Sequence, residues 1–135
     1  MSNKTIIETY YKKSQTVQFE LFYYAASMVG TKVLGTCDFA ELNGENTTKI
    51  IFNNTNIETI TYPSIYNVIE NITIQFNDGS AIFASNTYIS NNEYYEVGSK
   101  IIIPTTSCIG EFIGKSGYVV IDVEEDIRKI TIVLE

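Results

Sequence analysis

Apolar and polar residues alternate with a period of two along much of the chain, most clearly in VIENITIQF at residues 68–76. One set of alternate positions is mostly aliphatic or aromatic and the other mostly carries amides and hydroxyls, which is typical of a half-buried strand. The Asp78-Gly79 pair that follows predicts a two-residue type I′ hairpin turn, because both central residues of that turn need a positive φ. The cross-strand pairs obtained by counting from this turn include Phe76–Ala81, Ile74–Phe83, Ile72–Ser85 and Glu70–Thr87.

A second hairpin is predicted at the C-terminus, where GYVVIDV and RKITIVL flank a turn at Glu125-Asp126. Counting from this turn places Val119, Ile121, Ile130 and Ile132 on one aliphatic face. The other face places Asp122 opposite Lys129, an expected salt bridge with polar neighbours. The agreement of both faces supports this register.

Further strands are expected at residues 17–24, 35–42, 49–53, 57–62 and 94–103. About eight short strands with regular turn signals, and no convincing amphipathic helix, predict an all-β fold. A sheet without covering helices must close into a barrel or form a sandwich to protect its edges. Eight antiparallel strands closing on themselves leave an interior that side chains fill or that holds one small ligand.

The expected architecture is therefore a single antiparallel eight-stranded β-barrel with an apolar lumen, formed by residues 16–135. Residues 1–15 are expected to form an N-terminal tail or short arm.

Composition excludes several classes of function. The formal net charge is −7 and no basic run is present, so neither nucleic acid nor an anionic membrane is expected as a partner. The N-terminus lacks an apolar targeting region, so the expected location is cytoplasmic. The sequence contains no histidine, which excludes Ser-His-Asp and Cys-His nucleophile systems and argues against a zinc site. We therefore expect no metal site.

The segment GEFIGKSGYVV at residues 110–120 places three glycines before a β-branched strand. A phosphate-binding loop would need these glycines at a helix N-terminus, so we interpret them as corners that let the strands bend. The pattern Gly-x-Phe-x-Gly-x-x-Gly-Tyr-Val resembles the signature before the penultimate strand of the allene oxide cyclase and dirigent-like β-barrel superfamily.

Two other segments, VGTKVLGTCDFAELNGE and ITIQFNDGSAIFASNTY, are similar to that superfamily, which includes spirotetronate-type barrel cyclases. The resemblance covers most of residues 30–134. It implies an eight-stranded antiparallel barrel, frequently dimeric or trimeric, whose lumen folds a flexible apolar molecule into one reactive shape.

Glu70 is the first candidate for chemistry, because it is a carboxylate on an otherwise apolar strand face. Burial would raise its pKa and favour the neutral form, which could act as an acid or hydrogen-bond donor. The alternative is that the strand has barely begun at this position, which would leave Glu70 solvated at the barrel rim.

Tyrosines supply further candidates, because a phenol can both line a cavity and orient a carbonyl group. Tyr62 is the second catalytic candidate, beside the expected mouth of the barrel. The expected substrate-binding residues are Tyr23, Tyr66, Ile72, Ile74, Phe76, Phe83, Tyr88 and Ile121. Adjacent tyrosine pairs such as Tyr10-Tyr11 place one ring on each strand face, and outward rings indicate a subunit interface. This agrees with the homo-oligomer, a dimer or a trimer, that the resemblance implies.

The resemblance favours a cofactor-independent cyclase or isomerase that folds a small lipid-like or polyketide substrate inside the lumen. Holding a chain in a near-attack geometry lowers the barrier without a cofactor, by roughly 7–11 kcal/mol in favourable intramolecular reactions. Two alternatives stay open: a non-catalytic carrier of an apolar small molecule, and a self-associating structural barrel whose core is filled by side chains.

Overall fold

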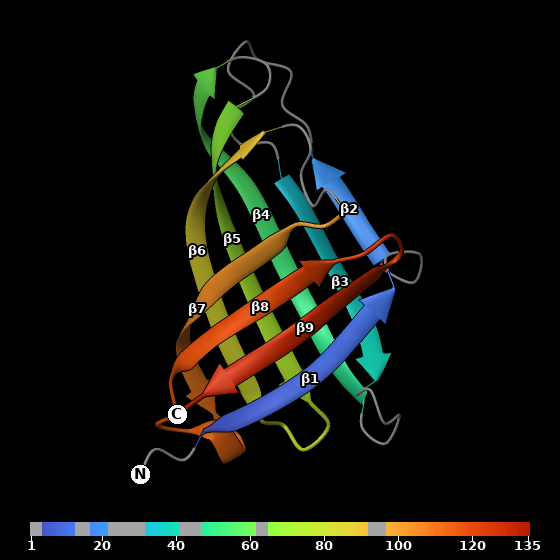
Figure 1. Ribbon diagram of the computed structural model, residues 1–135, viewed down its shortest axis with the longest axis vertical. Coiled ribbons are helices and arrows are strands. Elements are labelled where there is room, and N and C mark those ends of the chain that lie inside the picture. The colour runs from blue at the N-terminus through green and yellow to red at the C-terminus, as the bar shows by residue number, and fades with distance from the viewer. Residues whose placement is uncertain (1–3, 13–16, 22–31, 41–46, 62–64, 92–96) are drawn as a thin grey trace.

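The computed structural model describes residues 4–12, 17–21, 32–40, 47–61, 65–91 and 97–135 (Figure 1). These residues form nine strands and one short 3₁₀ helix: β1 (Thr5–Lys12), β2 (Val17–Leu21), β3 (Lys32–Ala40), β4 (Thr47–Thr61), β5 (Ile65–Phe76), β6 (Ala81–Asn91), β7 (Lys100–Ile109), η2 (Gly110–Phe112), β8 (Gly117–Val123) and β9 (Ile127–Leu134). The prediction of an all-β fold is confirmed, whereas the expected number of eight strands is not. None of the described segments is a helix with the length and hydrophobicity needed to span a membrane.

The nine strands form one sheet in the order β1-β9-β8-β7-β6-β5-β4-β3-β2, and each neighbouring pair is antiparallel. The sheet is curled, so that its edge strand β1 returns to contact β3 (Figure 1). The hydroxyl groups of Thr9 in β1 and Thr48 in β4 lie 3.4 Å apart across the interior and share a hydrogen bond. The architecture is therefore barrel-like.

Strand β7 changes partners halfway along its length, and this divides the sheet into two parts. Its first half, from Lys100 to Pro104, pairs with β8, and its second half pairs with β6. At the change, the Thr105 hydroxyl accepts a hydrogen bond from the Gly117 amide at 2.8 Å and donates one to the Gly117 carbonyl at 3.2 Å. The register between β6 and β7 shifts between Phe83 and Ala84, close to this point, and irregularities of this kind typically bend a strand.

The inward faces carry an aliphatic core. Its fully buried side chains include Ile50, Ile74, Ile82, Ile103, Val119, Ile121, Ile130, Ile132 and Leu134. The register predicted for the C-terminal hairpin is confirmed, with Ile121 opposite Ile130 and Asp122 opposite Lys129. The ion pair described for Asp122 is with Lys100 of β7 at 3.7 Å.

The register predicted for the β5–β6 hairpin is wrong by one residue. The loop contains three residues, because the Gly79 amide donates to the Phe76 carbonyl and the Phe76 amide donates to the Ser80 carbonyl. Gly79 has a φ of 90°, which suits a type I turn followed by a glycine bulge. Ile74 consequently pairs with Ile82, and Phe83 lies on the opposite face of the sheet from Ile74.

The N-terminal segment was expected to be a tail or short arm, but residues 5–12 form β1 and pair with β9 along its whole length. The alternate positions Thr9 and Tyr11 are buried. This strand is hard to recognise from sequence, because its inward positions include two threonines, and lysines stand at its last position and just before its first. The described fold therefore begins at Thr5.

The glycine-rich segment after β7 builds one end of the barrel-like sheet. Gly110 and Gly114 have φ angles of 72° and 81°, which L side chains rarely adopt. Between them, η2 places the buried ring of Phe112 against Phe76, with ring centroids 5.2 Å apart. A Cβ at Gly117 would overlap the carbonyl oxygen of Val133. The glycines therefore serve the backbone geometry, as the sequence interpretation expected.

Candidate ligand-binding interior

Glu70 lies inside the barrel-like sheet, with no exposed surface. It is in the middle of β5 because that strand begins at Ile65, and its inward neighbours Val68 and Ile72 are 1% and 4% exposed. The alternative of a solvated rim position is therefore wrong. The carboxyl interacts with the surrounding chain, while its Oε1 atom accepts no hydrogen bond.

A buried carboxyl is chemically distinctive in such a setting. Desolvation penalises a charged group more than a neutral one, so burial by itself favours the protonated carboxyl. The cross-strand neighbours of Glu70 are two polar residues, Asn54 and Asn86. In that form, Glu70 could donate a hydrogen bond to a carbonyl, epoxide or hydroxyl oxygen of a bound molecule.

Several expected substrate-binding residues share this interior. Ile72, Ile74 and Ile121 belong to the buried core, and Phe76 packs against it. Phe83 does not, because the one-residue change of register turns its strand position outward. Whether any of these residues contacts a ligand stays a prediction.

The tyrosine candidates are only partly placed. Tyr23 and Tyr62 lie outside the described residues. The backbone of Tyr66 is opposite Ser90, and that of Tyr88 is opposite Val68, but their side chains are not described. The structure therefore places Glu70 between the buried side chains of Val68 and Ile72, and the roles of the tyrosines stay predictions.

Arg128 is an inward polar residue that the sequence reasoning missed. It is 5% exposed, and its Nη1 atom donates hydrogen bonds to the carbonyls of Glu124 at 2.8 Å and Ile127 at 3.4 Å. Extending the count of the C-terminal hairpin by one pair would have placed Arg128 opposite Val123 on the aliphatic face. Among residues whose burial is described, Glu70 and Arg128 are the only buried charged side chains.

Cys108 is also buried and lies opposite Ile82 of β6. Burial raises the pKa of its thiol, so the reactive thiolate is disfavoured. Across the described ranges, no group of three or more cysteine, aspartate or glutamate side chains is placed to hold a metal ion.

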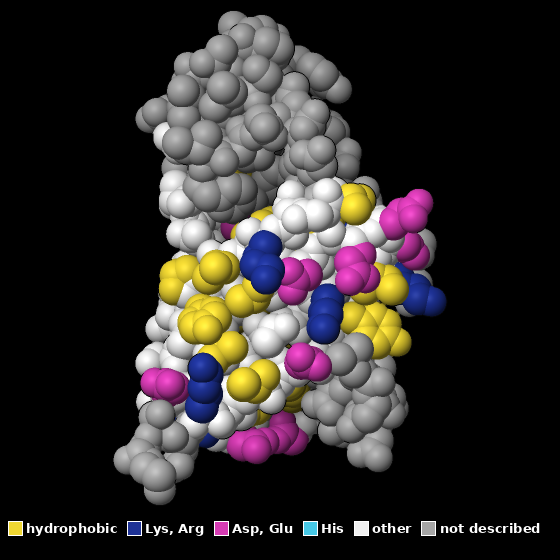
Figure 2. All heavy atoms as spheres, viewed as in Figure 1, with side chains coloured by type: hydrophobic (Ala, Val, Ile, Leu, Met, Phe, Trp, Pro, Cys, Tyr) yellow, Lys and Arg dark blue, Asp and Glu magenta, His cyan; other side chains and the backbone are white. Residues whose placement is uncertain are grey.

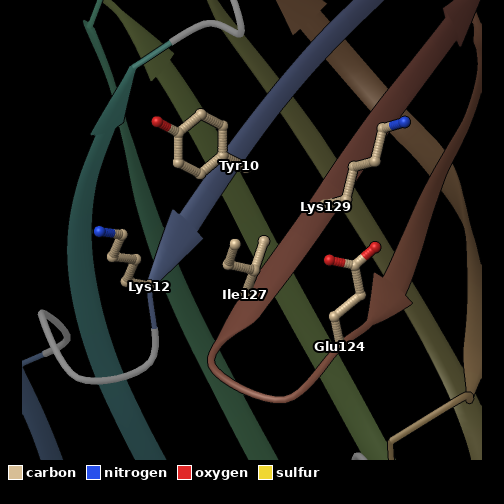
Figure 3. A pocket seen from close by; sticks show the side chains of 5 residues that line it. All are labelled: Tyr10, Lys12, Glu124, Ile127 and Lys129. Atoms are coloured by element: carbon tan, nitrogen blue, oxygen red, sulfur yellow. The ribbon is translucent and has the colours of Figure 1, made fainter.

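A separate hollow lies on the outer surface, where β1 meets the β8–β9 turn (Figure 3). It has a volume of about 280 Å³ and is lined by Tyr10, Lys12, Glu124, Ile127 and Lys129. The ammonium groups of Lys12 and Lys129 point away from each other (Figure 3). Because its charges do not converge on one point, this hollow is a weaker candidate for a specific site than the interior.

The comparison with protein families finds no matching model, and the comparison with curated proteins finds no match. Solved structures do match. The chain is similar to AbnU, an exo-specific intermolecular Diels-Alderase, with a TM-score of 0.71 at 14% identity, covering 97% of this chain and 96% of that one. It is similar to pyocyanin demethylase, with a TM-score of 0.68 at 13% identity, covering 98% and 99%.

A third similar structure is the pterocarpan synthase dirigent protein GePTS1, with a TM-score of 0.66 at 15% identity, covering 98% of this chain and 87% of that one. At these identities the likeness establishes the fold. The resemblance to dirigent-like barrels that the glycine motif indicated is thus confirmed at the level of the fold.

Proposed function

We propose that this chain binds an apolar small molecule inside its curled sheet and acts on it as a cofactor-independent cyclase or isomerase. The substrate would be lipid-like or a polyketide, and the sheet would close into a barrel around it through β1 and β3. The observation that carries the proposal is the carboxyl of Glu70, which is fully buried between Val68 and Ile72 on the inner face of β5.

The proposed mechanism needs only the groups of this chain. The neutral Glu70 carboxyl donates a hydrogen bond to a substrate oxygen and draws electron density toward it. Positioned acids of this kind typically contribute 10²- to 10⁴-fold to a rate. The aliphatic wall restrains the substrate chain near its reactive conformation, which lowers the entropic part of the barrier.

The similar structures support a role in handling small molecules, because one is a Diels-Alderase, one is a pyocyanin demethylase and one is a dirigent protein. The aliphatic interior alone would also suit a carrier. The two functions differ in whether the bound molecule is converted.

The test is incubation of the protein with a panel of polyenes and unsaturated epoxides, followed by chromatography and mass spectrometry. We expect a product of unchanged mass, and we expect Glu70→Gln to lower its rate about 100-fold while binding is retained. Glu8→Gln is the matched control, because Glu8 is exposed on β1. Retention without conversion would favour the carrier, and absence of any binding would contradict both functions.

The expected homo-oligomer stays a prediction. Hydrophobic side chains gather on the outer face over β7 and β8 (Figure 2), where Ile102 is 54% and Tyr118 is 39% exposed. Tyr118 is opposite Pro104 on one side and Val133 on the other. Such a surface is compatible with self-association.

A further inference from the structure

Strands β6 and β7 are paired over only part of their lengths. Their ladder runs from Ala81 with Ile109 to Ala84 with Thr105 and ends there. β6 continues to Asn91, and β7 begins earlier at Lys100, but no backbone pair joins these described portions. Figure 1 shows the two strands separating beyond the paired part. The wall of the sheet therefore contains a seam.

One side chain bridges this seam. The Asn86 carboxamide donates a hydrogen bond from Nδ2 to the carbonyl of Ile102 at 3.3 Å, and its Oδ1 accepts one from the Thr87 amide at 2.9 Å. It thus takes the place of a backbone pair between β6 and β7. A side-chain bridge of this kind opens by rotation about χ angles and leaves the strands in place.

The seam lies directly beside Glu70. Asn86 is the cross-strand partner of Glu70 in the β5–β6 ladder, and the two therefore share one face of the sheet. On the other side of the seam, Ile102 is 54% exposed whereas Ile103 is fully buried, so β7 has one face in solvent and the other in the core. At the opposite end of the paired segment, Phe112 of η2 packs against Phe76.

We propose that the β6–β7 seam is the port through which an apolar ligand reaches Glu70, and that the Asn86 carboxamide is its latch. This inference rests on the proposed function of the interior. The exposed Ile102 side chain supplies an apolar rim, which suits a ligand that is poorly soluble in water.

The test measures access to the interior without a ligand. In a Cys37→Ala, Cys108→Ala background, Glu70→Cys reports access at the seam, and Ile130→Cys reports access to an equally buried position on β9. Labelling with N-ethylmaleimide follows each thiol over time. We expect Asn86→Ala to accelerate labelling at position 70 about two- to tenfold, the factor for one net hydrogen bond, and to leave position 130 unchanged.

The control variants distinguish local opening of the β6–β7 seam from global opening of the structure. Asn71→Ala, an exposed asparagine of β5, should leave both labelling rates unchanged. Asn86→Asp keeps an oxygen for the Thr87 amide but lacks the donor to Ile102, so it should accelerate labelling as Asn86→Ala does. Val68→Cys, the next buried inward position of β5, replaces Glu70→Cys if that variant misfolds.

An unchanged rate at position 70 in Asn86→Ala would overturn the proposal. Equal acceleration at positions 70 and 130 would overturn it as well, since that result means global opening. Because labelling requires no bound molecule, the port can fail while the proposed function stands. If Glu70→Gln loses turnover but Asn86→Ala does not change labelling at position 70, the proposed function stands and the ligand enters at another point of the sheet.

Discussion

The carboxylate of Asp78 shapes the turn between β5 and β6. The backbone hydrogen bond from Ser80, 2.8 Å long, and a further bond from the Ser80 side chain lower the pKa of Asp78 below its ordinary 3.8. A carboxyl whose pKa is lower in the folded state stabilises the fold above its unfolded pKa, and this contribution disappears as pH falls through the folded value.

We therefore expect the free energy of unfolding of the wild type to exceed that of Asp78→Asn at neutral pH, and the difference to shrink below about pH 4. Urea unfolding at a series of pH values measures it. Glu111→Gln, an exposed carboxyl nearby in η2, is the control. A difference that stays constant from neutral to strongly acidic pH would contradict the role of the Asp78 charge.

Single residues also show how far sequence reasoning reaches. Alternation alone identified Glu70 as a carboxyl on an apolar face, but its burial depends on where β5 begins, and pairing with β4 decides that. Phe83 was placed on the wrong face because a single extra loop residue reverses every position of the following strand. Arg128 was within reach of the same counting that located Ile130.

At the scale of elements, two glycines at the start of β8 and just before it are required for different reasons. Gly117 has the Val133 carbonyl where a Cβ would stand, whereas Gly114 has open space and only the positive φ. Gly114→Ala should destabilise the fold by about 1–2 kcal/mol from backbone strain. Gly117→Ala should destabilise it by more than that, about 3 kcal/mol, because β8 and β9 must move apart.

Chemical denaturation of both variants gives the comparison. The unfolding slope should stay unchanged for Gly114→Ala if only native-state strain differs. If the free energy of unfolding falls more in Gly114→Ala than in Gly117→Ala, the close approach of Gly117 to β9 matters less for stability than the positive φ of Gly114.

The two predicted hairpins differ in how strictly the turn sequence determines the strand register. A turn at Glu125-Asp126 allows one register in which apolar residues face apolar residues and polar residues face polar residues, and that register is confirmed. Asp78-Gly79 suits both a two-residue turn and a three-residue turn with a glycine bulge, and the second is observed. Two strands were expected at residues 49–53 and 57–62, whereas β4 is one strand from Thr47 to Thr61, with register shifts after Asn56 and after Thr59.

For the molecule as a whole, the sequence was sufficient for an all-β, barrel-like fold because composition and period are local properties. The change of partners in β7 was not predictable, because it depends on contacts between residues far apart in the chain. The same holds for β1, which closes against β9 at the other end of the sequence.

The junction of the two parts of the sheet gives the last prediction. Thr105 supplies both hydrogen bonds that hold β7 to Gly117 where the backbone ladder to β8 has ended. Thr105→Val keeps the shape of the side chain but leaves the Gly117 amide without this acceptor, so we expect a loss of about 1–3 kcal/mol in the free energy of unfolding.

Thr106→Val is the matched control, because the exposed Thr106 hydroxyl donates a single hydrogen bond, to the Phe83 carbonyl at 3.2 Å. The free energy of unfolding should fall less in Thr106→Val than in Thr105→Val, since water can replace the Thr106 hydrogen bond. Amide exchange should locate the difference: in Thr105→Val the Gly117 amide should exchange faster, while the amides of the β8–β9 hairpin beyond it keep their protection. If Thr105→Val is no more destabilising than Thr106→Val, the two parts of the sheet are held together by packing of the core and not by the Thr105 hydroxyl.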